Sequence, residues 1–284
     1  MSTQPFLPPA GGGAMALIAA LLEQRTGQQI AANRAWRLET SLKPLLRDVG
    51  LETIDALVDQ LRTRRDPALS DKVVDALLNQ ESSFFRDAPV IDAVVAAVAE
   101  RDALSGRRVR IWSAGCSRGQ EPLSLAILLE ERGLGRSVEI VATDVSHGAL
   151  ASARSGRFSQ FEIQRGLSMH RMVKWFTVEG GEWAVDGQLL SRIAFRQHNL
   201  VSDAPPPGGF DVVLCRNVML YFDPGVRRRV FDGLLRAVRP GGLLVLGAGE
   251  TVIGQTDAFE PSEDWRGFYR RADDAAPPRA VAAG

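Results

Sequence analysis

Four short β-rich runs alternate with helix-length segments beyond residue 105 of the sequence. The runs are RVRIWSA, VEIVATD, FDVVLC and GLLVLGA. The segments between them begin near Glu121, Ser146 and Gly225 and repeat apolar residues at helical spacing. Buried strands that alternate with helices form a mostly parallel sheet with helices on both faces. The sequence therefore predicts an α/β domain with a doubly wound, Rossmann-like sheet, over residues 89–271.

The preceding part of the chain follows a helical pattern. In residues 15–88 apolar side chains recur at intervals of three and four, as at Leu17, Leu21 and Leu22, and no stretch alternates as a strand does. This pattern predicts a small all-α N-terminal domain. Both ends of the chain are rich in Ala, Gly and Pro, so residues 1–14 and 272–284 are expected to be disordered tails. The runs WAVDG and RIAFRQ lie around turn residues and predict a small antiparallel β insert over residues 176–198.

Charge and cysteine content limit the kinds of function. The chain has 34 basic and 34 acidic residues, so it has no bulk attraction for nucleic acid. Its two cysteines, Cys116 and Cys215, provide neither a disulfide framework nor a tetracysteine metal site. The sequence has no signal-peptide pattern and no stretch of about 18 apolar residues. We therefore expect a cytoplasmic monomer without membrane insertion.

A glycine turn and an acidic residue follow the first two predicted strands. The strand Val109–Ser113 leads into Gly115-Cys-Ser-Arg-Gly119 and then into a helix, and VEIVATD ends at Asp144. Glycines let the backbone approach a ligand, and doubly wound folds place at the second strand an acid that accepts ribose hydroxyls. Tight strand–helix packing also explains the turn alone, and a helix N-cap also explains Asp144 alone. Together the two features predict a pocket for an adenosine-containing ligand.

The turn matches neither the dinucleotide fingerprint nor the P-loop, so it does not predict pyrophosphate binding. The segment RIWSAGCSRGQEPLSLAI resembles the cofactor loop of CheR-type methyltransferases instead. Two further blocks, NQESSFFRD and FDVVLCRNVMLYFD, resemble the same family in the same order. The resemblance covers about residues 15 to 271. It implies S-adenosylmethionine as cofactor, no metal, and methyl transfer to glutamate carboxylates in the cytoplasmic domain of membrane chemoreceptors.

The resemblance also implies which residues form the site. Arg86 and Tyr221 are expected at the reacting centre. Arg86 can pair with the methionine carboxylate of the cofactor, and the hydroxyl of Tyr221 can orient the incoming carboxylate of the acceptor. The cofactor contacts are expected at Gln80, Ser82, Arg86, Glu121, Asp144, Asn199, Leu200, Arg216 and Asn217. The family usually has Thr-Asn-Glu-Thr before its Phe-Phe-Arg, whereas this chain has Asn79-Gln-Glu-Ser82; the amide and the last hydroxyl are kept.

Transfer from a sulfonium to a carboxylate needs no general base, because glutamate is ionised at neutral pH. We accordingly expect His147, His170 and His198, which lie outside the three blocks, to be surface or helix residues. We expect Cys215 to be a core residue, because displacement at a sulfonium needs no covalent step. The enzyme must supply a dry, aligned approach, and such alignment contributes on the order of 7 to 11 kcal/mol.

The helical domain is expected to recognise the substrate. Family members meet the receptor with a positively charged helix, and the matching segment here is NRAWRLETSLKPLLRD, with four basic side chains against Glu39 between residues 34 and 47. Helical spacing separates a leucine face from the basic side, although a solvated polar face also explains this distribution, and Pro44 weakens a single straight helix. The substrate-binding residues are predicted to be Arg37, Lys43 and Arg47.

Some CheR enzymes hold a pentapeptide from the receptor's C-terminus as an added strand on the insert. The segment from Phe176 to Asn199 is 24 residues long, shorter than the resemblance leads us to expect of a tethering member. We therefore expect no such peptide to bind. Two other functions remain open: a methyltransferase with another acceptor, and a non-catalytic CheR-like scaffold that binds the cofactor or a receptor.

Overall fold

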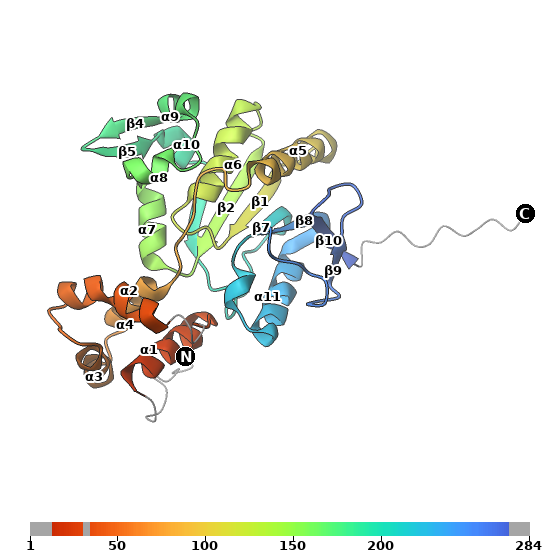
Figure 1. Cartoon of the computed structure of the whole chain (residues 1–284). Coiled ribbons are helices and arrows are strands. Elements are labelled where there is room, and N and C mark those ends of the chain that lie inside the picture. The colour runs from red at the N-terminus through yellow and green to blue at the C-terminus, as the bar shows by residue number, and fades with distance from the viewer. Residues whose placement is uncertain (1–12, 31–34, 273–284) are drawn as a thin grey trace, which may run out of the picture.

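The computed structural model describes residues 13–30 and 35–272. Its N-terminal part consists of helices, as predicted, which Figure 1 shows in red and orange beside the rest of the molecule. Leu42, Leu57 and Leu61 are fully buried in the cluster that these helices form. Thr53 and Asp66 accept main-chain N–H groups and so begin two of the helices. The helices are α1 (Ala14–Thr26), α2 (Ala35–Asp48), α3 (Ile54–Arg64) and α4 (Pro67–Leu77).

The central sheet has the strand order β6-β2-β1-β7-β8-β10-β9. The first five strands are parallel and the last two pair antiparallel. Ile111 and Leu214 pack with one helix layer, whereas Trp112 and Val213 pack with the other, so the sheet is doubly wound as predicted. The strands are β1 (Val109–Ala114), β2 (Val138–Asp144), β6 (Ile193–Gln197), β7 (Phe210–Cys215), β8 (Val238–Leu246), β9 (Phe259–Pro261) and β10 (Phe268–Arg271).

Helices α5, α6, α7 and α11 pack on the sheet (Figure 1). Apolar side chains of α5 and α6 join the cluster on one face, and those of α11 join the cluster on the other. This confirms the α/β fold class. Their bounds are α5 (Ala88–Ser105), α6 (Gln120–Glu131), α7 (His147–Ser155) and α11 (Pro224–Ala237).

The insert begins and ends earlier in the chain than predicted. A three-stranded antiparallel sheet with the order β3-β5-β4 is present, but the second half of the predicted segment is wrong. RIAFRQ contains β6, and Ile193 pairs parallel with Ile140 of the central sheet. The parallel partner lies some 50 residues earlier, out of reach of a local pattern. The insert comprises β3 (Arg157–Phe158), α8 (Gln160–Gln164), α9 (Met169–Trp175), β4 (Phe176–Glu179) and β5 (Glu182–Val185), and α10 (Gly187–Leu190) leads on to β6.

Three smaller expectations can be compared with the structure. Helix α2 continues through Pro44 to Asp48, so the proline does not end it. The predicted tails lie outside the described residues, except that Gly13, Ala14 and Ala272 are described and Ala14 begins α1. Within the described ranges, we find no helix with the length and apolar character to cross a membrane.

Candidate active site

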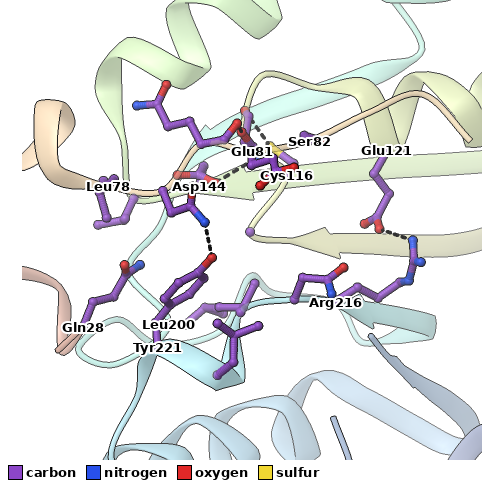
Figure 2. Close-up of a pocket in the computed structure, with 18 of the residues that line it drawn as sticks. Gln28, Leu78, Glu81, Ser82, Cys116, Glu121, Asp144, Leu200, Arg216 and Tyr221 are labelled. Atoms are coloured by element: carbon purple, nitrogen blue, oxygen red, sulfur yellow. Dashed lines mark hydrogen bonds and ion pairs between the residues drawn. The ribbon is translucent and has the colours of Figure 1, made fainter. Parts of the chain in front are cut away.

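A pocket lies at the carboxyl edge of the sheet, where the segments after β1, β2, β6 and β7 meet the end of α4 and the residues after α1 (Figure 2). The space between its walls is about 1150 Å³ with the open mouth included, so the pocket is open to solvent. The predicted cofactor and catalytic residues all line it: Gln80, Ser82, Arg86, Glu121, Asp144, Asn199, Leu200, Arg216, Asn217 and Tyr221.

The glycine turn forms the floor beside β1. Gly115 has a φ of +85°, and a β-carbon there would lie 2.6 Å from Cγ2 of Val218. Only glycine satisfies both the left-handed backbone and the close approach. Ser117 also has a positive φ, of +50°, and its N–H donates to Oδ2 of Asp144 at 2.8 Å. The turn is therefore fixed against the acid that ends β2.

Asp144 is anchored by main-chain donors. Its Oδ1 accepts the N–H of Ser146 at 2.9 Å, in addition to the bond from Ser117. Burial raises the pKa of Asp144, and the two N–H bonds partly offset that effect. The N-cap of α7 is Ser146, whose hydroxyl accepts from Ala149, so capping does not explain Asp144. Each carboxylate oxygen retains a lone pair for a ligand hydroxyl.

Arg216 is buried in the pocket wall and bonds three residues of two segments. Its side chain is 2% exposed, and its guanidinium pairs with Oε2 of Glu121 at 2.9 Å and Oδ2 of Asp87 at 2.5 Å. It also donates to the main-chain oxygen of Arg86 at 3.1 Å. Glu121 accepts a further bond from Ser113 at 2.7 Å. The network, whose Glu121–Arg216 bond Figure 2 shows, holds the Arg86–Asp87 turn against α6.

Arg86 itself faces the pocket with an uncompensated charge. Its side chain is exposed, and the described part of the chain supplies no ion-pair partner for it. Its neighbours Phe85 and Asp87 have positive φ angles of 50° and 55°, a strained turn of the kind that occurs at functional sites. A guanidinium in this position can bind a carboxylate.

Tyr221 is held from two sides by residues of the N-terminal part. Its hydroxyl accepts a hydrogen bond from Nδ2 of Asn79, and its main-chain oxygen accepts the N–H of Gln29 at 2.9 Å. Gln28 forms an antiparallel bridge with Phe222. The residues after α1 therefore pair directly with the segment that carries Tyr221.

The side-chain amide of Asn199 is occupied by the fold. Its Nδ2 donates to the main-chain oxygen of Arg25 at 2.8 Å, and its Oδ1 accepts the N–H of Val201 at 3.0 Å. Asn199 lies in the pocket wall, but this amide cross-links the end of α1 to the segment after β6. Gln80 makes a similar cross-link through Nε2, which donates to the hydroxyl of Ser146 at 3.1 Å.

The sequence analysis missed Glu250. Its carboxylate accepts the N–H groups of Asn217 at 2.7 Å, Met219 at 2.8 Å and Gly247 at 2.8 Å. Asn217 has a positive φ of 59°, so these three bonds stabilise a strained turn that leads to Tyr221. Its place just beyond the end of a parallel strand, as with Asp144, is the signal by which it could have been found.

The expectation for His198 was wrong, because it is buried and lies in the pocket wall. Its Nε2 bonds the main-chain oxygen of Ala204 at 3.0 Å and its ring meets the edge of Trp112. Burial lowers the pKa of His198, which favours the neutral ring. His147 and His170 are exposed on helices, as expected.

Both cysteines are buried and unpaired, and burial raises the pKa of both thiols well above its usual range. Cys215 is fully buried at the end of β7, which confirms that it is a core residue.

The basic face of α2 is partly described. Lys43 and Arg47 are exposed, whereas the side chain of Arg37 lies outside the described residues. Leu38, Leu42 and Leu45 are buried on the other face, in agreement with the helical spacing.

Comparisons with known proteins agree with this geometry. The family model "CheR methyltransferase, SAM binding domain" matches residues 80–267. Chemotaxis protein methyltransferase 1 of Pseudomonas aeruginosa is 35% identical over 265 residues, which cover 90% of this chain and 96% of the relative. Chemotaxis protein methyltransferase Cher2 of Pseudomonas putida is 33% identical over 248 residues, which cover 84% and 90%.

The family match makes the protein an S-adenosylmethionine-dependent methyltransferase, and the doubly wound sheet, the glycine turn and the anchored acid at one pocket agree with that class. The residues present fit this cofactor, because the pocket combines the half-buried carboxylate of Asp144 for the ribose with the guanidinium of Arg86 for the methionine carboxylate. The chain belongs to the CheR methyltransferase family.

Proposed function

We propose that the protein methylates glutamate side chains in the cytoplasmic domain of membrane chemoreceptors and forms glutamate methyl esters in chemotaxis. The observation that carries the proposal is a cofactor pocket whose wall includes residues of the helical part. The chain also matches proteins named chemotaxis protein methyltransferases along nearly their whole length. The family membership supports this acceptor and a cytoplasmic location.

S-adenosylmethionine, when bound, supplies a methyl group on a positively charged sulfur. The protein's own residues bind, align and exclude water. Asp144 accepts hydrogen bonds from the ribose hydroxyls, and Arg86 pairs with the methionine carboxylate of the cofactor. The hydroxyl of Tyr221 donates a hydrogen bond to the incoming carboxylate and so fixes its direction of approach. A glutamate carboxylate is ionised at neutral pH, so no residue has to remove a proton.

We propose that Arg37, Lys43 and Arg47 dock the receptor, because α2 presents Lys43 and Arg47 to solvent and a chemoreceptor's methylated helices carry acidic side chains. Charge reversal to Glu at Lys43 and Arg47 should raise the KM for receptor at least severalfold and leave cofactor affinity unchanged. Salt should weaken receptor methylation by the unchanged protein in the same sense. Equal KM values for both proteins would remove this face from the docking site.

We also propose that the protein acts as a monomer and without a pentapeptide tether. The hairpin between β4 and β5 is a two-residue turn at Gly180 and Gly181, with no longer loop to cover an added strand. Receptors with and without the tail should therefore be methylated at equal rates. Low-micromolar binding of the free peptide would contradict this.

The test of the proposed reaction uses the full chain, labelled cofactor and receptor-containing membranes. Label should enter the receptor and be released as methanol by alkali, which cleaves esters. Label in another molecule would indicate a methyltransferase with a different acceptor. Cofactor binding without any transfer would indicate a non-catalytic scaffold.

A further inference from the structure

The side chain of Asn79 ends on the hydroxyl of Tyr221. In the described part of the chain this is the one hydrogen bond recorded for that amide, and Nδ2 is the donor. Both side chains are half-buried and both line the pocket. The two residues are 142 positions apart, one after α4 and one after β7, so the contact exists only in the folded protein.

The direction of this bond determines what the tyrosine can do. A phenolic hydroxyl has one proton to donate and lone pairs that accept. When Asn79 donates to that oxygen, the proton of Tyr221 is free for another acceptor. If the amide were reversed, its oxygen would accept the proton and the hydroxyl would have none left for a substrate. The orientation of Asn79 therefore sets the polarity of Tyr221.

Neighbouring contacts hold both partners in place. Gln80, the residue after Asn79, is fixed by bonds to the hydroxyl of Ser146 and to the main-chain oxygen of Asp75. The main chain of Tyr221 is fixed by Gln29. The main-chain oxygen of Gln80 also accepts the hydroxyl of Ser117 at 3.0 Å, so main-chain contacts beside both partners limit their movement.

We propose that Asn79 is a positioning residue that keeps the hydroxyl of Tyr221 as a hydrogen-bond donor toward the acceptor carboxylate. This inference rests on the proposed function, since it presumes that Tyr221 meets an anionic acceptor. Asn79 itself touches neither cofactor nor acceptor in this account. Its effect is transmitted through the tyrosine.

Two substitutions separate this role from simple packing. Asn79→Leu keeps the shape and removes the bond. Asn79→Asp keeps a bond but reverses it, because a carboxylate can only accept the tyrosine proton. If the bond merely stabilises the fold, the Asp variant should resemble the unchanged protein. If the bond sets polarity, the Asp variant should be at least as impaired as the Leu variant.

The experiment measures kcat and KM for methyl transfer to a receptor cytoplasmic fragment, with Tyr221→Phe and both double variants as references. We expect Asn79→Leu to lower kcat roughly five- to tenfold, the effect of one hydrogen bond, with cofactor KM unchanged. In the Tyr221→Phe background both Asn79 substitutions should have no further effect on kcat. That background also measures the effect of the added charge of the Asp variant alone. Calorimetry with S-adenosylhomocysteine and a melting curve control for folding.

The outcomes distinguish the inference from the proposed function. Full kcat for Asn79→Asp, or additive losses in the double variants, would overturn the role of Asn79 while Tyr221 kept its own. An undiminished kcat for Tyr221→Phe would overturn the catalytic role of Tyr221. Absence of transfer to receptor by the unchanged protein would overturn the proposed function, and the inference with it.

Discussion

Replacing Arg216 by Met should reveal how much of the pocket depends on one buried cation. The substitution keeps an unbranched side chain of similar reach and removes the pairs with Glu121 and Asp87. Glu121, whose side chain is 16% exposed, would keep a single side-chain donor, Ser113. Asp87 is 39% exposed, so water replaces most of its lost interaction.

Breaking a buried ion pair by removing one partner costs about 3–5 kcal/mol. We take the lower end, about 3 kcal/mol, because half of the network is solvated. For a protein of this size each kcal/mol lowers the Tm by roughly 2–4 °C, so the expected decrease is about 6–12 °C. The Arg86 turn should loosen as well, which should weaken cofactor binding.

The assays are denaturant unfolding and calorimetry with S-adenosylhomocysteine. Arg132→Met is the matched control, because the pair of Arg132 with Asp92 is exposed on both sides and should contribute less than about 1 kcal/mol. Adding Glu121→Gln to Arg216→Met should restore part of the stability, since the more buried of the two unpaired carboxylates is then neutral and Asp87 is solvated. A loss for Arg216→Met no larger than that of the control would refute the reasoning.

Three further predictions concern single positions. Asp144→Asn should weaken cofactor binding about tenfold or more, since an amide replaces a charged acceptor. Because burial raises the pKa of Asp144, the cofactor affinity of the unchanged protein should fall as the pH decreases through that pKa. Calorimetry on the variant should show no such pH dependence. Gly166→Ala should prevent stable folding, because its β-carbon would lie 1.8 Å from the main-chain oxygen of Phe84, and a melting curve should show far less effect for Gly180→Ala, which has open space. Glu250→Gln should cost about 1–3 kcal/mol of unfolding free energy, because its amide cannot accept three N–H groups; an unchanged melting curve would count against it.

Local patterns were sufficient for the centre of the fold and for one end of the site. The strands β1 and β2, the turn at Gly115 and the acid at Asp144 follow one another within residues 109–144, so the order of local patterns carries the prediction. Helix periodicity likewise identified the buried face of α2. Each of these features depends on neighbours within a few turns of the chain.

Features that depend on distant partners were not predictable in this way. The segment containing β6 alternates like a hairpin strand, and only its parallel partner β2 shows that it belongs to the central sheet. The antiparallel strands β9 and β10 were missed because they are short. The interactions of Arg216 and Asn199 reach across 129 and 174 positions, so a resemblance placed them at the pocket without indicating what their side chains bind.

The helical part and the pocket cannot be treated as separate functions. Gln29 bonds the main chain of Tyr221, and Asn199 bonds the main chain of Arg25, so the end of α1 is attached to two segments of the pocket wall. These bonds are short-range and directional, and a displacement of α1 by a fraction of an ångström would weaken them. A receptor that docked on α2, as proposed, would bind a helix in the same apolar cluster as α1, and the residues after α1 hold the main chain of Tyr221. Under that proposal, receptor docking and the alignment of Tyr221 would be coupled through the packing of these helices.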